Sequence, residues 1–95
     1  MSFEWDNRKN AANIRKHGFS FERAKAIFNG EQLTFKDKRK DYEEDRFISI
    51  GIMGSITVIA VVHTDRKGNT RIISARPANR KERKHYEAYK KGLSH

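Results

Sequence analysis

The stretch FISIGIMGSITVIAVVH, from Phe47 to His63, decides the fold because it contains two β-rich runs joined by a tight turn. The runs Phe47 to Met53 and Ile56 to His63 are rich in β-branched residues. Gly54-Ser55 between them suits a two-residue type II′ turn with glycine first. This hairpin sets Arg46 opposite His63.

A second hairpin follows directly. The segment from Asp65 to Asn69 has the composition of a turn and leads into a strand from Thr70 to Ala75. A turn centred on Lys67 sets His63 opposite Arg71. The two hairpins together predict a sheet face that is apolar along nearly its whole length and ends in one polar row, formed by Arg46, His63 and Arg71.

Helices are predicted before and after these strands in the sequence. Asp6 and Ser20 are suitable N-caps for two helices that end at Gly18 and Gly30, after a short aromatic strand at residues 3–5. Residues 36–45 form a charged loop without periodicity. Pro77 ends the last strand, and Asn79 with Glu82 forms a capping pair for a C-terminal helix.

These elements predict an α+β fold of one domain, residues 1–95. A short N-terminal strand and two helices come first, followed by an antiparallel sheet of about four strands and a C-terminal helix. The chain has no cysteine, which excludes disulfides and thiolate metal sites. Its histidines lack zinc-binding spacing, and neither a P-loop nor a serine-hydrolase elbow occurs, so we expect no metal and no cofactor.

Positive charge is concentrated at the C-terminal end. From Asp65 to His95 there are ten Lys and Arg residues against three acidic residues, which leaves +7 of the chain's formal +9. A charge asymmetry of this size is typical of a surface that binds a phosphate-bearing partner, so RNA or DNA is the expected ligand. No apolar run is long enough for a membrane span and no secretory leader is visible, so we expect a cytoplasmic protein with no membrane partner.

The polar row suits RNA cleavage without a metal. That reaction needs a base for the 2′-hydroxyl proton, cations for the phosphorane charge and a donor for the leaving oxygen. His63 is the predicted base, because an imidazole is partly neutral near pH 7. Arg46, Arg71 and Arg76 are the predicted cations, because a guanidinium matches phosphate geometry.

Other roles stay open at this point. Tyr86 is the first choice for the acid, ahead of Arg76 and His85, although Tyr86 also suits packing. Glu44 or Lys67 would take over as base if His63 is only a polar residue at a strand end. Further basic residues are expected to bind RNA without taking part in the chemistry: Arg66, Lys67, Arg80, Arg83 and Lys84.

Segments spread over nearly the whole chain resemble the BrnT toxins, the ribonuclease half of a bacterial type II toxin–antitoxin pair. The resemblance rests on the order and spacing of several short segments: Phe3-Glu4-Trp5-Asp6, Lys16-His17-Gly18, Ser20-Phe21, Arg46-Phe47, His63-Thr64, Arg71 to Arg76, Glu82 and Tyr86. It implies a RelE-like fold, metal-independent RNA cleavage that inhibits translation, and a hetero-oligomer with a BrnA-like antitoxin that adds DNA binding and autoregulation. The loop at residues 36–45 matches least well.

Two functions of different classes are therefore expected from the sequence. The first is an endoribonuclease toxin that a cognate antitoxin neutralises. The alternative is a non-catalytic basic module that binds RNA or DNA through the same surface. A binder loses affinity gradually as basic residues are removed, whereas a nuclease loses turnover on one or two changes.

Overall fold

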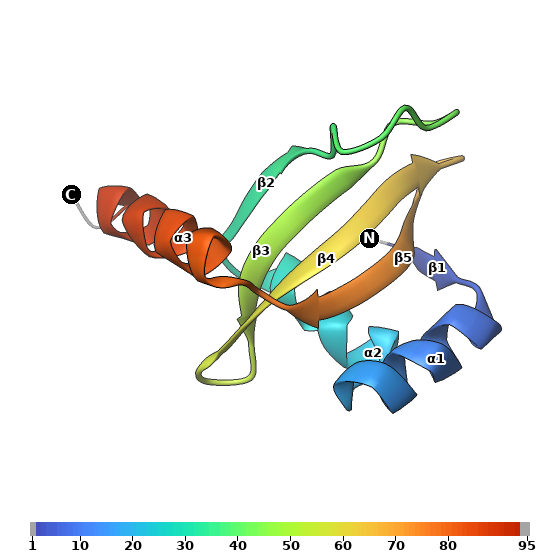
Figure 1. Ribbon diagram of the computed structural model, residues 1–95, viewed down its shortest axis with the longest axis horizontal. Coiled ribbons are helices and arrows are strands. Elements are labelled where there is room, and N and C mark those ends of the chain that lie inside the picture. The colour runs from blue at the N-terminus through green and yellow to red at the C-terminus, as the bar shows by residue number, and fades with distance from the viewer. Residues whose placement is uncertain (1, 94–95) are drawn as a thin grey trace.

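A computed structural model describes residues 2–93 (Figure 1). The elements follow one another in the order β1 (Phe3–Trp5), α1 (Asn7–His17), α2 (Phe21–Ala24), the 3-10 helix η1 (Lys25–Asn29), β2 (Gln32–Lys36), β3 (Phe47–Met53), β4 (Thr57–Arg66), β5 (Asn69–Pro77) and α3 (Arg80–Leu93). The α+β class and the order of strands and helices predicted from the sequence are confirmed.

The sheet has five strands in the order β1-β5-β4-β3-β2. Neighbours are antiparallel except β1, which pairs in parallel with β5. The prediction of an antiparallel sheet of about four strands is therefore corrected to a mixed sheet. Parallel pairing is possible because a long crossover separates β1 from β5 in the chain. The strand β2 was not revealed by the sequence pattern.

The first hairpin differs from its predicted register by one residue. Met53 pairs with Thr57, so three residues form the loop instead of two, and Phe47 rather than Arg46 lies opposite His63. Ile56 belongs to this loop and is 85% exposed. Because successive side chains of a strand alternate between faces, this shift moves His63 to the face opposite Arg46.

The second hairpin also departs from the predicted register. Arg66 pairs with Asn69, which leaves a two-residue loop of Lys67 and Gly68. Both loop residues have positive φ, 51° and 85°, as a type I′ turn requires. Thr64 therefore pairs with Arg71, and a bulge follows between Val62 and His63. The predicted pairing of His63 with Arg71 is wrong.

Helix ends follow the predicted caps. The Asp6 carboxylate accepts hydrogen bonds from the Arg8 and Lys9 amides at 2.7 and 3.2 Å, and the Ser20 hydroxyl accepts one from Arg23 at 3.1 Å. Gly18 ends α1 with φ of 82°, a conformation that glycine adopts without strain. These caps set the directions in which α1 and α2 leave β1 and approach the sheet.

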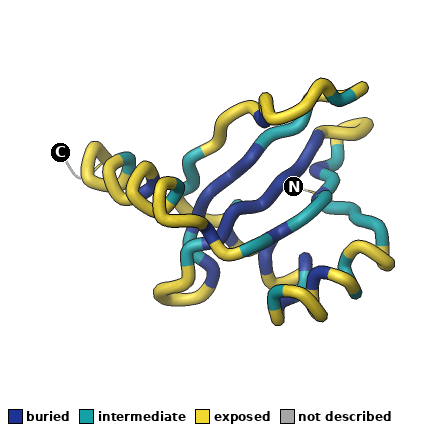
Figure 2. Tube along the Cα trace, viewed as in Figure 1, coloured by how far each residue is buried: buried dark blue, intermediate teal, exposed yellow. Residues whose placement is uncertain are grey.

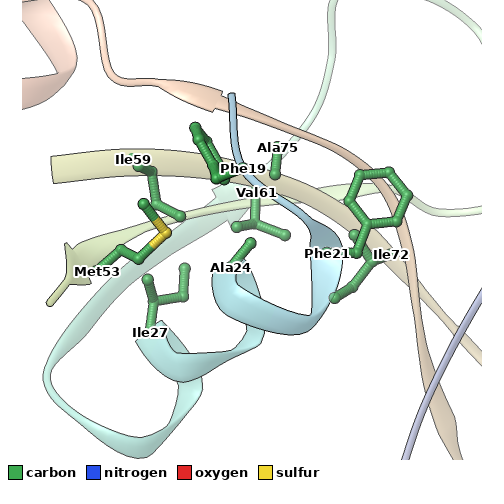
Figure 3. Packing of buried hydrophobic residues seen from close by; sticks show 9 residues of the cluster. All are labelled: Phe19, Phe21, Ala24, Ile27, Met53, Ile59, Val61, Ile72 and Ala75. Carbon is green, nitrogen blue, oxygen red and sulfur yellow. The ribbon is translucent and has the colours of Figure 1, made fainter. Parts of the chain in front are cut away.

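One face of the sheet is covered by α1, α2 and η1, and we call it the α1–α2 face. Its core is a single apolar cluster (Figure 3): Phe19, Phe21, Ala24, Ile27, Met53, Ile59, Val61, Ile72 and Ala75. Asn13 is buried on α1 and ties the helix to the sheet. Its amide donates to the Phe19 carbonyl and its carbonyl accepts from the Ala75 amide.

The opposite face is covered only in part, by α3, and we call it the α3 face. Its apolar cluster lies beneath the helix: Ile48, Ile50, Ala60, Val62, Ala78 and Tyr86. Figure 1 shows α3 near β2 and β3 and the loop between β2 and β3 at the other end of the strands. In Figure 2 this loop and most of α3 are exposed, whereas β3 and β4 are largely buried.

Candidate functional site

The end of the α3 face that lies away from α3 carries the two predicted arginines, Arg46 and Arg71. The residue between them is Thr64 and not the predicted His63. Arg71 pairs across the strands with Thr64, so these two residues share a face. The Thr64 hydroxyl donates to the carbonyl of Asp45, next to Arg46. Thr64 therefore occupies the place between the two arginines that was predicted for His63.

Each predicted catalytic arginine is paired with a glutamate. Arg46 Nη2 lies 3.4 Å from Glu44, and Arg71 Nη1 donates to Glu4 at 2.7 Å. The Arg46 and Arg71 side chains are 26% and 28% exposed, so both are partly accessible to solvent. The hydrogen bond from Arg71 lowers the pKa of Glu4, which keeps this pair ionised at neutral pH.

Arg76 lies further along the same face. Arg71 and Arg76 pair with Thr64 and Ala60, four residues apart on β4. At about 3.3 Å per residue, their backbones are roughly 13 Å apart. Arg76 is therefore separate from Arg46 and Arg71, which lie beside Thr64.

At the start of α3, the amides of Asn79 and Glu82 are already bonded within the chain. Asn79 and Glu82 form the predicted capping pair, with reciprocal hydrogen bonds of 2.9 and 2.8 Å. Arg76 also donates to both oxygens of Glu82, at 2.7 and 2.9 Å. Burial acts to raise the pKa of Glu82, but the bonds from Arg76 and the Asn79 amide outweigh it and lower the pKa.

His63 lies on the α1–α2 face and is only 8% exposed. Its ring packs edge-on against Phe28, with centroids 5.1 Å apart, and near Phe47 at 6.0 Å. Nε2 shares a 2.7 Å hydrogen bond with the Ser49 hydroxyl, which in turn bonds Thr34. Burial lowers the pKa of His63, with Asp65 opposing the shift, so the imidazole is neutral at pH 7. Its position does not favour contact with RNA held by the arginines.

Tyr86, the first choice for the acid, is likewise buried. Its side chain is part of the apolar cluster beneath α3 and is 2% exposed. The hydroxyl donates to the carbonyl of Glu31 at 3.0 Å, and burial raises the pKa of the phenol. This geometry favours a packing role. His85, an alternative acid, is exposed on α3.

The residues predicted to bind RNA lie on two separate surfaces. Arg66 lines a hollow together with Arg46, on the α3 face, and Lys67 lies at the tip of the second hairpin. Arg80, Arg83 and Lys84 are exposed on α3, where Arg83 also donates to the Ala78 carbonyl at 2.7 Å. The structure therefore joins only Arg66 closely to the arginine pair at Thr64.

Sequence reasoning gave no role to Asp37 or Tyr42 in the loop between β2 and β3, or to Glu4. Asp37, at the start of the loop, has a fully buried side chain that accepts two hydrogen bonds from the Arg39 guanidinium, each 2.8 Å long. The charged, non-periodic sequence of the loop gave no indication that Asp37 is buried and bonded to Arg39. Glu4 was missed because its partner Arg71 lies 67 positions later in the chain.

Comparison with known proteins identifies the class to which this fold and site belong. Residues 5–82 match the family described as the ribonuclease toxin, BrnT, of type II toxin-antitoxin systems. The chain therefore belongs to this family of ribonuclease toxins.

A solved structure supports the same assignment. The chain resembles the ribonuclease toxin BrnT of Brucella abortus with 27% sequence identity and a TM-score of 0.67, over 84% of this chain and 99% of that one. The search among curated proteins gave no significant match. Within residues 2–93, no helix is long and apolar enough to cross a membrane.

Proposed function

We propose that this protein is a metal-independent endoribonuclease that inhibits translation and is neutralised by a cognate BrnA-like antitoxin in a hetero-oligomer. The observation that carries the proposal is the grouping of Arg46 and Arg71 around Thr64 on the accessible α3 face, with Arg76 further along it. Membership of a ribonuclease toxin family supplies the reaction class and implies an RNA target and an antitoxin.

In the proposed reaction, the 2′-hydroxyl oxygen of one nucleotide attacks the adjacent phosphorus. A base takes the hydroxyl proton, the bond from phosphorus to the 5′-oxygen breaks, and an acid protonates that oxygen. The products are a 2′,3′-cyclic phosphate and a free 5′-hydroxyl. Arg46 and Arg71 stabilise the charge on the phosphorane oxygens, because guanidinium groups stay charged and form paired hydrogen bonds to phosphate.

Glu44 takes the place of His63 as the base in this proposal. Its carboxylate is 43% exposed and lies beside Arg46, whereas His63 is on the other face of the sheet. Binding of the phosphate by Arg46 replaces its weak 3.4 Å contact with Glu44 and leaves the carboxylate available for the proton. Arg76 binds a neighbouring phosphate, and His63 and Tyr86 stabilise the fold.

The test is incubation of the purified protein with end-labelled RNA in EDTA. We expect fragments with 2′,3′-cyclic phosphate ends, and loss of these fragments in Arg71→Ala and Glu44→Gln variants whose circular dichroism spectra match the unmodified protein. Arg15→Ala, an exposed arginine on α1, is the matched control. RNA binding without cleavage in any buffer would instead support the non-catalytic module.

The antitoxin part of the proposal has its own test. The partner is expected to cover the α3 face with acidic and apolar side chains, so antitoxin and RNA compete for the toxin. Titration of a BrnA-like antitoxin into the cleavage assay should abolish product formation at equimolar ratio. A ternary complex that cleaves at the full rate would contradict neutralisation by occlusion of this face.

A further inference from the structure

The loop between β2 and β3, residues 37–46, is a folded lobe rather than a solvated connection. The Asp37 side chain is fully buried and accepts hydrogen bonds from the Arg39 guanidinium and amide and from the Tyr42 hydroxyl. These bonds lower the pKa of Asp37 to about 2, so the carboxylate stays ionised at neutral pH. A loop anchored by an ionised, buried side chain has a defined shape before any ligand arrives.

Tyr42 and Arg46 form the centre of this lobe. The Arg46 guanidinium lies 4.2 Å from the centroid of the Tyr42 ring, within stacking distance. Both residues line a hollow of about 540 Å³, and Arg66 from β4 lines its other side. The Nε of Arg46 is buried and has no hydrogen-bond partner among residues 2–93. The hollow thus adjoins the proposed reaction site, since Arg46 belongs to both.

The charge around the hollow distinguishes it from a general groove for the phosphate backbone. Three cations, Lys40, Arg46 and Arg66, line it together with three carboxylates, Asp41, Glu43 and Glu44. A surface that only attracts phosphates would carry cations alone, because carboxylates repel them. Carboxylates do accept hydrogen bonds from the amino groups of bases, and aromatic rings stack on base faces.

We infer that this hollow is a base-recognition site, in which one nucleotide next to the scissile phosphate stacks on Tyr42 and presents an exocyclic amino group to the carboxylates. Lys40 and Arg66 bind the phosphates on either side of that nucleotide. Guanine, adenine and cytosine fit this site and uracil does not, because uracil has no amino group. The inference rests on the proposed function, since it assumes that the bound strand is the RNA substrate.

The test uses short oligonucleotides with a 2′-O-methyl backbone and a single free 2′-hydroxyl, so that only one phosphate is cleavable. The base on each side of that phosphate is varied among guanine, adenine, cytosine, uracil and inosine. Binding is measured by fluorescence anisotropy with fully 2′-O-methylated copies, and cleavage by kcat/KM with the cleavable set. At one flanking position, guanine is expected to bind about 10-fold or more tightly than uracil or inosine, which lacks the amino group of guanine.

Substitutions assign this preference to the lobe. Tyr42→Leu removes the ring and should lower affinity about 10- to 100-fold and abolish the base preference. Tyr42→Phe keeps the ring, loses only the hydroxyl bond to Asp37 and should retain the preference. Ile56→Ala, at the distant hairpin loop, is the control. Equal binding of all bases to the unmodified protein, unchanged preference in Tyr42→Leu, or equal loss in Tyr42→Phe would overturn the inference.

The two proposals fail in different ways. If the unmodified protein cleaves none of the oligonucleotides in any buffer, the proposed ribonuclease function is wrong, while the binding series still decides whether the hollow reads a base. If cleavage occurs at equal rates next to every base and binding is equally indifferent, the ribonuclease function stands and the base-recognition site is wrong.

Discussion

His63 and Thr64 are neighbours in the chain but lie in opposite environments. His63 lies on the α1–α2 face between Phe28 and Phe47, where burial lowers its pKa. Thr64 faces the α3 side, beside Arg71. Both faces bury an apolar cluster, and the α3 face also presents the side chains of Arg46 and Arg71. The comparison shows that, in a strand, a single step along the chain decides which face of the sheet a polar residue lies on.

The largest effect on the reaction is expected from the α3 face. Arg71→Ala removes the cation that we propose stabilises the phosphorane, and it should lower kcat for RNA cleavage by about 10²- to 10³-fold, with little change in fold. Single-turnover cleavage of end-labelled RNA measures this. Arg15→Ala on α1 should retain the full rate, and a decrease equal to that of Arg71→Ala would show that net charge, rather than position, is responsible.

The next effect concerns the α1–α2 face and is an effect on stability. His63→Ala leaves a space beside two aromatic rings and removes one of the two hydrogen-bond partners of the Ser49 hydroxyl, the other being Thr34. We expect the free energy of unfolding to fall by about 2–4 kcal/mol, as measured by urea denaturation. RNA cleavage per folded molecule should stay normal. Loss of cleavage in the folded variant would restore His63 as the base and contradict the division between the faces.

A smaller effect is expected from pH. Because burial lowers the pKa of His63 below its ordinary value of 6.5, the unfolded chain binds more protons than the folded chain below that pH. Stability should therefore decrease as the pH falls from 6.5, by at most about 1.4 kcal/mol per pH unit. Denaturation at pH 7.5, 6.5 and 5.5 should show this decrease in the unmodified protein. Parallel behaviour of His63→Ala would show that another group is responsible.

The smallest expected effect tests the register of the first hairpin. Ile56→Ala should change the free energy of unfolding by less than about 0.5 kcal/mol, because the side chain is 85% exposed in the three-residue loop. Thermal denaturation measures it. A loss of 2 kcal/mol or more, in the range roughly expected for a buried isoleucine, would place Ile56 in the sheet. The two-residue turn would then be correct, and His63 would lie on the face of Arg46.

The sequence was sufficient to predict β1, β3, β4 and β5, the capping residues and the grouping of Arg46 with Arg71. Each of these depends on local patterns, such as Asp6 before a helix or Pro77 at a strand end. The register was wrong because it depends on loop length, and both Gly54-Ser55 and Lys67-Gly68 allow loops of two or more residues. Both hairpin registers differ from the predicted ones by one residue, so Arg46 and Arg71 still share a face as predicted. Of the predicted row, only His63 lies on the face opposite the one predicted for it.

The order in the loop between β2 and β3 could not be predicted, for a different reason. Its bonds depend on Asp37 being buried, and burial is a property of the folded chain. A solvated loop and an anchored loop can contain the same lysine, arginine and aspartate residues, so composition does not distinguish them. The pairing of β1 with β5 was missed for a similar reason, since three residues of aromatic character do not indicate a partner so distant in the chain.

The parallel pairing of β1 with β5 also determines when the protein becomes complete during synthesis. Phe3 pairs with Thr70, and Glu4 accepts a hydrogen bond from Arg71, so β1 cannot form its pairing until β5 has been synthesised. Contacts across such long separations form late in folding. A nascent chain therefore lacks the pairing that holds Arg71 in place until β5 has been synthesised.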